Sequence, residues 1–185
     1  MTVFLIRHGL TQGNRDRRYI GCRTDEPLCA AGMAMLRKKQ VPCVRRVLTS
    51  PMARCIESAR ILYPSIEPEI VPDFRECDFG AFEGMSYAQL NGRTDYQAWI
   101  DSGGELPFPG GESRAQFAAR CIRAFDALHL WQWGGDCALV VHGGVIMAVM
   151  AAYAVPKGAY FDFQVPCGEG FALEEDGHHT FMAFG

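Results

Sequence analysis

The sequence has no hydrophobic run long enough to cross a bilayer and no excess of basic residues. Its 185 residues carry a formal net charge of -3, and 21% of them are charged. A transmembrane helix needs about 20 consecutive apolar residues, and a general nucleic-acid binder usually shows a basic face or a high pI. We therefore expect neither a membrane nor a nucleic acid as partner, and any anion site must be built locally.

The chain also lacks a recognisable secretory leader and a cysteine framework. The first residues, MTVFLI, carry no basic segment and too short an apolar run for a signal peptide. The eight cysteines are widely scattered and include no Cys-x-x-Cys pair, whereas disulfide-rich and metal-binding chains show regular cysteine spacings. We therefore expect a cytoplasmic protein with reduced cysteines that mostly fill the core.

No internal repeat, low-complexity tract or linker divides the chain. With 49% hydrophobic residues, a chain of this length can bury the core of one domain. We predict a single domain over 1–185, with an irregular lid-like insert at about 73–112. An HExxH motif and a clustered Asp-x-Asp are missing as well, so we expect no metal and no cofactor.

Apolar patterning predicts strands that alternate with helices. The expected strands lie at 3–7, 44–50, around 70, and 138–141. The expected helices lie at about 28–39, from 51 onward, from 114 onward, and at about 145–153. Ser50 is the expected N-cap of the second helix, and Ser113 with Gln116 forms a capping box for the third.

The C-terminal part shows a period of two. Phe161, Phe163 and Val165 alternate with other residues, and further apolar positions follow at 171 and 173. This spacing predicts antiparallel strands in the tail. Together the elements predict a three-layer α/β/α sandwich with a mixed, mostly parallel sheet and a small helical lid insert.

Basic side chains follow the predicted strands where each strand ends. Arg7 and His8 come after the first strand, Arg54 falls in the first turn of the next helix, and His142 follows the strand at 138–141. Ligands of open α/β sheets bind outside the carboxyl ends of the strands. A guanidinium is a planar fork of donors, and a charge-assisted hydrogen bond contributes about 1.5–3 kcal/mol. The four residues therefore predict a phosphoryl-binding site.

Two histidines at one site need different roles. An imidazole has an unperturbed pKa of about 6.5, so one ring can attack as a neutral nucleophile while a cationic partner stabilises the phosphoryl oxygens. Phosphoryl transfer depends on positioning and charge neutralisation, so such a cluster can work without a metal. Each histidine taken alone also has an ordinary structural interpretation as a hydrogen-bonded group at a strand end.

These residues form part of an ordered set of motifs that resembles the histidine phosphatase superfamily, also called the phosphoglycerate mutase-like superfamily. The matching segments are, in order, LIRHGLTQGN, YIGCRTDEPLCAAG, TSPMARCIESA, FRECDFGAFEGM, PGGES and VVHGGVI. They run from residue 3 to about 147. An isolated Arg-His-Gly would be a weak signal, whereas the ordered set is specific.

The resemblance implies a role for each matched residue. His8 is the implied nucleophile, which forms a phosphohistidine, and Glu76 is the implied acid, which protonates the leaving oxygen and later activates water. The implied phosphate-binding residues are Arg7, Asn14, Arg54 and His142. The loop after the signature is a candidate substrate loop, comprising Gly21, Cys22, Arg23 and Thr24.

The sequence departs from the family pattern at two positions. Leu10 stands where Glu or Gln is usual, which affects local hydrogen bonding more than the chemistry. Cys22 stands where glycine is common, and we expect an inert loop residue, with an oxidisable thiol as the alternative. Asp78 and Glu83 are nearby rivals of Glu76 for the role of the acid.

Within the family, phosphatases pass the phosphoryl group to water, whereas mutases return it to a bound intermediate. The mutases that we compare carry an insertion after the acid-bearing motif and a C-terminal extension, and neither is present here. The resemblance therefore favours hydrolysis of a small phosphorylated metabolite. Phosphoglycerate mutase activity and a non-catalytic phosphate-binding relative are the alternatives.

Aromatic residues cluster between 79 and 99. They form either an apolar lid around a leaving group or the small core of the insert. Compact bacterial members of the family include alpha-ribazole phosphatases of cobalamin assembly, whose leaving nucleoside carries an apolar aromatic base. The sequence leaves the substrate open, and it leaves open whether the protein is a monomer or a homodimer.

Overall fold

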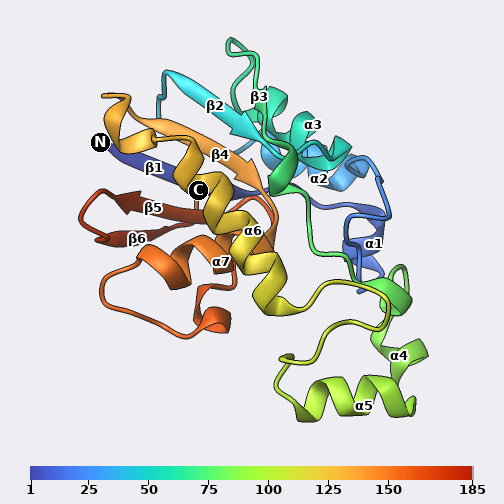
Figure 1. Ribbon diagram of the computed structural model, residues 1–185. Coiled ribbons are helices and arrows are strands. Elements are labelled where there is room, and N and C mark those ends of the chain that lie inside the picture. Colours follow the sequence, from blue (N-terminus) through green and yellow to red (C-terminus); the bar gives the residue numbers. More distant parts are fainter. Residues whose placement is uncertain (185) are drawn as a thin grey trace.

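The structure, a computed structural model, describes residues 1–184, and its centre is a six-stranded sheet with the order β3-β2-β4-β1-β5-β6 (Figure 1). The strands are β1 (Thr2–Arg7), β2 (Arg46–Thr49), β3 (Glu69–Ile70), β4 (Cys137–Val141), β5 (Gly170–Glu174) and β6 (His179–Met182). The pairs β1–β4, β4–β2 and β2–β3 are parallel. β5 pairs antiparallel with β1, and β6 pairs antiparallel with β5. The predicted mixed, mostly parallel sheet is confirmed.

Seven α-helices are described in residues 1–184. They are α1 (Gln12–Arg15), α2 (Ala30–Leu36), α3 (Ala53–Leu62), α4 (Tyr87–Leu90), α5 (Thr94–Asp101), α6 (Arg114–Ala127) and α7 (Gly143–Tyr153). Short 3-10 turns are η1 (Pro72–Phe74), η2 (Gly80–Phe82), η3 (Leu130–Gln132) and η4 (Tyr160–Phe163). The predicted capping box opens α6: Ser113 Oγ accepts from the Gln116 amide at 3.1 Å, and Gln116 Oε1 accepts from the Ser113 amide at 2.9 Å.

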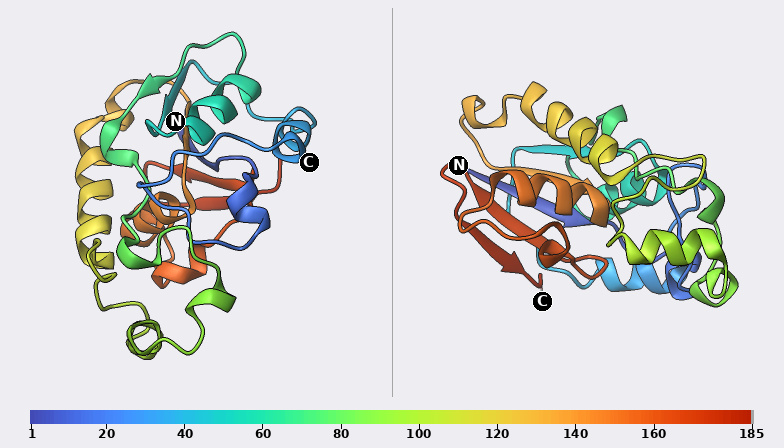
Figure 2. Two further views of the ribbon diagram at one scale, coloured as in Figure 1. Left: turned by 90° about the vertical axis from the view of Figure 1, so that its right-hand side faces the viewer. Right: turned by 60° about the horizontal axis from the view of Figure 1, so that its bottom comes forward.

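Helices cover both faces of the sheet. Successive side chains of a strand point to opposite faces, so Leu5 of β1 packs in the same buried cluster as Phe117 of α6. Its neighbour Ile6 packs on the other face with Leu36 of α2 and Leu62 of α3. In the left view of Figure 2, α6 and α2 lie on opposite sides of the strands. The predicted three-layer sandwich is confirmed.

The predicted N-cap of α3 is wrong. Met52 occupies the N-cap position and its side chain makes no cap bond, while the Ala53 amide donates to Asp25 Oδ1 at 2.7 Å. The hydroxyl of Ser50 instead lies 2.7 Å from Nε2 of His142, which belongs to a different part of the chain. The same hydroxyl accepts from the Met52 amide at 3.3 Å, so it serves His142 and the turn before α3 but no amide within the helix.

The strand predicted at 161–165 is also wrong. Residues Tyr160–Phe163 form η4, in which the Asp162 amide donates to the Ala159 carbonyl at 3.0 Å. The Asp162 carboxylate accepts from the Ala159 amide at 2.8 Å. These local bonds satisfy the backbone without a neighbouring strand. The antiparallel strands predicted further on are present as β5 and β6.

Residues 73–112 carry α4 and α5, which lie on a protrusion beside the sheet (Figure 1). Phe82, Leu90 and Tyr96 are buried there, so the protrusion has packed apolar contacts of its own. The division into one domain with an insert stays a prediction. Among residues 1–184, no helix is both long enough and apolar enough to cross a membrane.

Candidate active site

The two histidines meet at the carboxyl ends of β1 and β4. These strands are parallel neighbours in which Arg7 pairs with Val141, so the next residue of each strand, His8 and His142, reaches the same edge of the sheet. Their ring centroids lie 5.2 Å apart with an interplanar angle of 69°. Both side chains are buried. The sequence-based expectation that the strand ends converge is confirmed.

The hydrogen bond of His8 defines which ring nitrogen is available. Nδ1 lies 2.7 Å from the carbonyl oxygen of Gly9. A carbonyl can only accept, so Nδ1 carries the proton and Nε2 keeps its lone pair. Burial, together with the charges of Arg54 and Arg7, holds the pKa of His8 well below its usual range. The ring is therefore neutral at neutral pH, with Nε2 able to act as a nucleophile.

The two arginines are oriented by backbone carbonyls. Arg7 Nη1 donates to Val165 at 2.7 Å, and Arg54 donates through Nη1 to Thr24 and through Nη2 to Gly21, both at 3.0 Å. The Nε atoms of both arginines are buried without a partner in residues 1–184. A buried donor that lacks a partner is costly, so an anion that accepts from these atoms would be stabilised.

His142 begins α7 and is held by two side chains from another part of the chain, Ser50 and Cys55. It is the N-cap of α7, its Nε2 lies 2.7 Å from Ser50 Oγ, and Cys55 Sγ lies 3.5 Å from the same nitrogen. Burial, followed by the charge of Arg54, lowers the pKa of His142 well below its usual range. A bound phosphate dianion would raise that pKa, because an opposite charge favours the protonated ring. Sequence reasoning missed Ser50 as a partner of His142, although Ser50 lies in the arginine motif TSPMARCIESA.

The carboxyl group of Glu76 lies against the first turn of α7. Its Oε1 accepts from the Cys77 amide at 3.0 Å, and Gly144 lies directly beside the carboxylate. A Cβ atom at Gly144 would lie 2.5 Å from Oε1, so only glycine leaves room here. Burial raises the pKa of Glu76 above its ordinary value. A carboxyl group with a raised pKa is suited to general acid catalysis.

The two rival carboxylates are engaged elsewhere. Asp78 Oδ1 lies 2.7 Å from Arg23 Nε, and the ion pair helps to hold the pKa of Asp78 below its ordinary value despite its partial burial. Glu83 Oε1 accepts from the Gly21 amide at 2.8 Å. Both groups therefore tie loops together, and within residues 1–184 neither lines the cavity that Glu76 shares with His8.

The candidate substrate loop contacts its own neighbours. Gly21 and Thr24 present their carbonyls to Arg54, while the Cys22 amide donates to the Cys77 carbonyl at 3.1 Å. Burial raises the pKa of the Cys22 thiol, which disfavours the reactive thiolate. In residues 1–184, no residue of the loop lines the cavity above the histidines.

A cavity of about 670 Å³ opens above His8. Arg7, His8, Asn14 and Glu76 line its base, and the buried Arg54 and His142 belong to the same cluster without lining the cavity. We call these six residues the polar floor. We call the rings above it the aromatic wall, comprising Tyr19, Phe79, Trp99, Phe108, Tyr160 and Phe161. Asn14 reaches the cavity from α1, where its Oδ1 accepts from the Thr11 amide at 3.3 Å.

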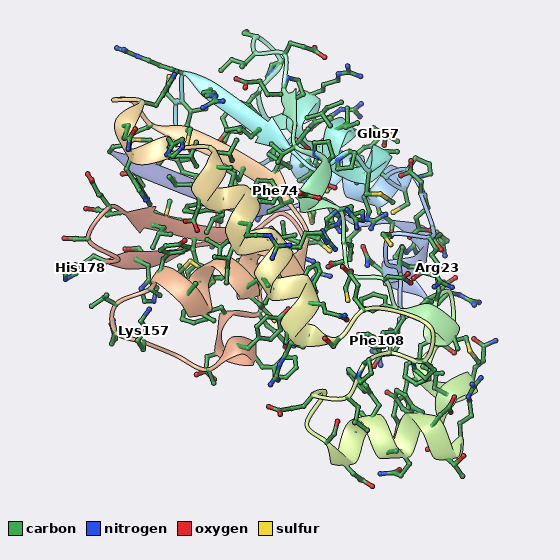
Figure 3. The ribbon with its side chains drawn as sticks, in the orientation of Figure 1. Arg23, Glu57, Phe74, Phe108, Lys157 and His178 are labelled. Atoms are coloured by element: carbon green, nitrogen blue, oxygen red, sulfur yellow. The ribbon has the colours of Figure 1, made fainter. Side chains whose placement is uncertain are left out.

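The insert supplies both a wall and a core. Phe79 and Trp99 line the cavity, whereas Phe82 and Tyr96 are buried within the insert. The two interpretations of the aromatic cluster therefore each describe part of it. Figure 3 shows Phe108 where the insert rejoins the body of the molecule. Sequence reasoning missed Phe108 as a cavity residue, because only the fold brings it to the wall.

His178, the first of two adjacent histidines in the tail, lies far from this site. His178 is at the end of the molecule opposite to Arg23 and Phe108 (Figure 3). Within residues 1–184, no group of three His, Cys, Asp or Glu side chains is arranged to hold a metal ion. The expectation that the protein needs no metal stays a prediction.

Comparison with known families places the chain among proteins of known chemistry. Residues 3–182 match the family described as "Histidine phosphatase superfamily (branch 1)". The chain is 28% identical over 183 residues to "Adenosylcobalamin/alpha-ribazole phosphatase" of Escherichia coli, which covers 94% of this chain and 90% of that protein. It is 29% identical over 153 residues to "Probable phosphoglycerate mutase GpmB" of Proteus mirabilis, which covers 77% and 70%.

Similar solved structures also include an alpha-ribazole phosphatase and a phosphoglycerate mutase by name. The crystal structure of a putative alpha-ribazole-5'-P phosphatase from Escherichia coli matches with a TM-score of 0.85 at 25% identity, over 100% of this chain and 95% of that one. A phosphoglycerate mutase from Thermus thermophilus matches with a TM-score of 0.77 at 29% identity, over the full length of both chains. The relatives therefore include both phosphatases and mutases.

Proposed function

The chain belongs to the histidine phosphatase superfamily, and we propose that within it the protein hydrolyses a small phosphomonoester through a phosphohistidine intermediate. The observation that carries this proposal is the pair of buried, adjacent imidazoles, 5.2 Å apart, of which His8 is held with Nε2 unprotonated. The expected cytoplasmic location stays a prediction.

The first step transfers the phosphoryl group to His8. Nε2 attacks phosphorus, the bond between phosphorus and the ester oxygen breaks, and Glu76 gives its proton to that oxygen. Arg7, Arg54 and His142 donate hydrogen bonds to the phosphoryl oxygens, which carry the negative charge of the transition state. The raised pKa of Glu76 keeps a larger fraction of the group protonated for this step.

The second step returns the enzyme to its starting state. Water attacks the phosphorus, and the ionised Glu76 takes a proton from that water. The bond between phosphorus and Nε2 breaks, so inorganic phosphate leaves and His8 is again neutral. The charges of Arg7 and Arg54 support this step too, because the same phosphoryl oxygens carry the charge.

The aromatic wall favours an apolar aromatic leaving group. Ring faces stack on a flat base, whereas the three-carbon acid of phosphoglycerate needs a cation for its carboxylate. Besides Arg7, two arginines line the cavity, but Arg114 pairs with Glu105 at 2.6 Å and Arg18 donates to the Gly84 carbonyl at 2.8 Å. We therefore propose alpha-ribazole phosphate, a cobalamin precursor, as the substrate class to test first.

The test compares wild type with His8→Ala in the presence of EDTA. We expect metal-independent hydrolysis of p-nitrophenyl phosphate and alpha-ribazole phosphate by the wild type, an acid-labile phosphohistidine at position 8, and loss of both in the variant. His178→Ala, at the far end of the molecule, is the matched control and should retain full activity. Equal rates for wild type and His8→Ala would rule out the mechanism. Conversion of 3-phosphoglycerate to 2-phosphoglycerate with a bisphosphate primer would instead show a mutase.

A further inference from the structure

The segment that carries Glu76 is held by the ion pair between Arg120 and Glu112, which lies outside the pair of histidines. Arg120 of α6 binds Glu112 through two parallel bonds, from Nε to Oε1 at 3.0 Å and from Nη2 to Oε2 at 2.8 Å. Only 8% of the Arg120 side chain and 20% of the Glu112 side chain is exposed. In residues 1–184, neither lines the cavity above His8. The mechanism proposed above leaves this pair without a role.

The pair holds the backbone on both sides of Glu76. Arg120 Nη1 donates to the carbonyl of Asp73 at 2.6 Å and to that of Arg75 at 3.1 Å. Glu112 Oε2 accepts from the Asp78 amide at 3.0 Å, and the Glu112 amide donates to the Asp78 carbonyl at 3.0 Å. The chain is therefore fixed immediately before Glu76 and two residues after it.

The side chain of Glu76 has little else to orient it. Within residues 1–184 its carboxylate accepts from the backbone amide of Cys77 and bonds no other side chain. Its position thus depends on where the backbone places it. A general acid must lie within about 2.6–3.2 Å of the atom that it protonates, and a displacement of about 1 Å can lower a rate about 100-fold.

We propose that Arg120 and Glu112 are positioning residues that hold Glu76 at the leaving oxygen. The inference rests on the proposed function, because it assumes that Glu76 is the acid. The ion pair fixes residues 75 and 78, which fixes the direction in which the intervening carboxyl group points. The segment PGGES therefore does more than open α6, since its glutamate links the helix to the acid-bearing loop.

The test uses the dependence of rate on the leaving group. Glu112→Gln keeps the shape and one oxygen but removes the charge that orients Arg120. p-Nitrophenolate leaves without protonation, whereas the alkoxide of a primary alkyl phosphate needs the acid. We expect kcat/KM for the alkyl ester to fall at least 10-fold, within the roughly 10²- to 10⁴-fold range of general acid catalysis. We expect kcat/KM for p-nitrophenyl phosphate to change less than about 3-fold, because that leaving group does not need the acid.

Two variants complete the comparison. Arg120→Lys keeps the charge and loses the two parallel bonds, and we expect the same selective loss on the alkyl ester; it also serves if Glu112→Gln does not fold. Glu69→Gln is the matched control, because Glu69 binds Arg46 through two bonds of 2.8 Å at the β2–β3 edge, away from the cavity. Glu69→Gln should leave kcat/KM unchanged for both esters.

The outcomes separate this inference from the proposed function. Glu76→Gln sets the pattern expected for loss of the acid, and a matching pattern in Glu112→Gln and Arg120→Lys supports the positioning role. If kcat/KM falls equally for both esters in these two variants, the positioning role is wrong and the ion pair is purely structural. If His8→Ala is inactive but Glu76→Gln shows no selectivity, the assignment of the acid is wrong and the positioning role falls with it. Activity retained in His8→Ala would instead reject the proposed function.

Discussion

The polar floor and the aromatic wall of the cavity are held by different kinds of contact. Floor residues are fixed by directed hydrogen bonds, such as those from His8 to Gly9 and from Arg54 to Gly21. Wall residues are fixed by ring packing, in which Trp99 and Phe79 each lie 4.9 Å from Phe108 between ring centroids. Directed bonds define one position for each group, whereas ring contacts tolerate changes of shape. The difference implies that the floor determines the reaction and the wall selects the leaving group.

The largest effect is expected on the floor. Arg54→Met removes the guanidinium but keeps much of its stem, so kcat/KM should fall about 10²- to 10³-fold or more, as when one preorganised donor is lost. Both p-nitrophenyl phosphate and a larger aromatic ester should lose rate equally, because they share the phosphoryl group. Arg60→Met on the exposed side of the same helix is the control. A loss of less than about tenfold, well short of the value of one preorganised donor, would show that Arg54 is not central to the site.

A smaller and more selective effect is expected on the wall. Trp99→Ala removes a ring over the leaving group, and stacking of a base on an aromatic side chain contributes about 1–3 kcal/mol. We expect kcat/KM for alpha-ribazole phosphate to fall about 5- to 150-fold, the equivalent of that energy, with a much smaller change for a short alkyl phosphate. Trp133→Ala, an exposed tryptophan outside the cavity, is the control. Equal losses on the two esters would contradict a role of the wall in selection.

The smallest effect concerns stability. Burial raises the pKa of Glu76, so the folded state favours the protonated form. The contribution of this group to the free energy of unfolding is therefore fully present below its ordinary pKa and is lost as pH rises through the raised pKa. Glu76→Gln removes the cost of burying a charged carboxylate, so it should raise the Tm at pH 7 by about 2–4 °C for each kcal/mol of that cost. The gain in Tm should vanish in acid, where Glu76 is already protonated. Thermal unfolding at several pH values, with exposed Glu175→Gln as control, measures this. A lower Tm at pH 7 would show that the charged form is favoured instead.

The parts of the fold that depend on local signals were predictable. The capping box of Ser113 and Gln116 marks the start of α6, because its bonds span only three residues. The floor was predictable from Arg7, His8, Arg54 and His142, because parallel strands bring their carboxyl ends to one edge. The third strand near 70 was also expected, although it has only two residues.

The parts that depend on distant partners were not predictable. Ser50 satisfies the local rule for a helix cap, but His142 takes its hydroxyl. One wrong prediction has a local cause instead: Phe161 and Phe163 alternate as in a strand, yet the Asp162 carboxylate accepts from the Ala159 amide and closes a 3-10 turn. Arg120 reads as one more polar position of an amphipathic helix, and only the folded chain shows its bonds to the acid-bearing loop.

The position of β1 between β4 and β5 has a consequence for how the protein gains its activity. His8, the proposed nucleophile, is made among the first residues of the chain, but its imidazole partner His142 follows a strand that is synthesised much later. No N-terminal fragment that stops before residue 142 can therefore complete the site, however well it forms its own helices. During refolding, the return of turnover will therefore report the docking of β4 beside β1.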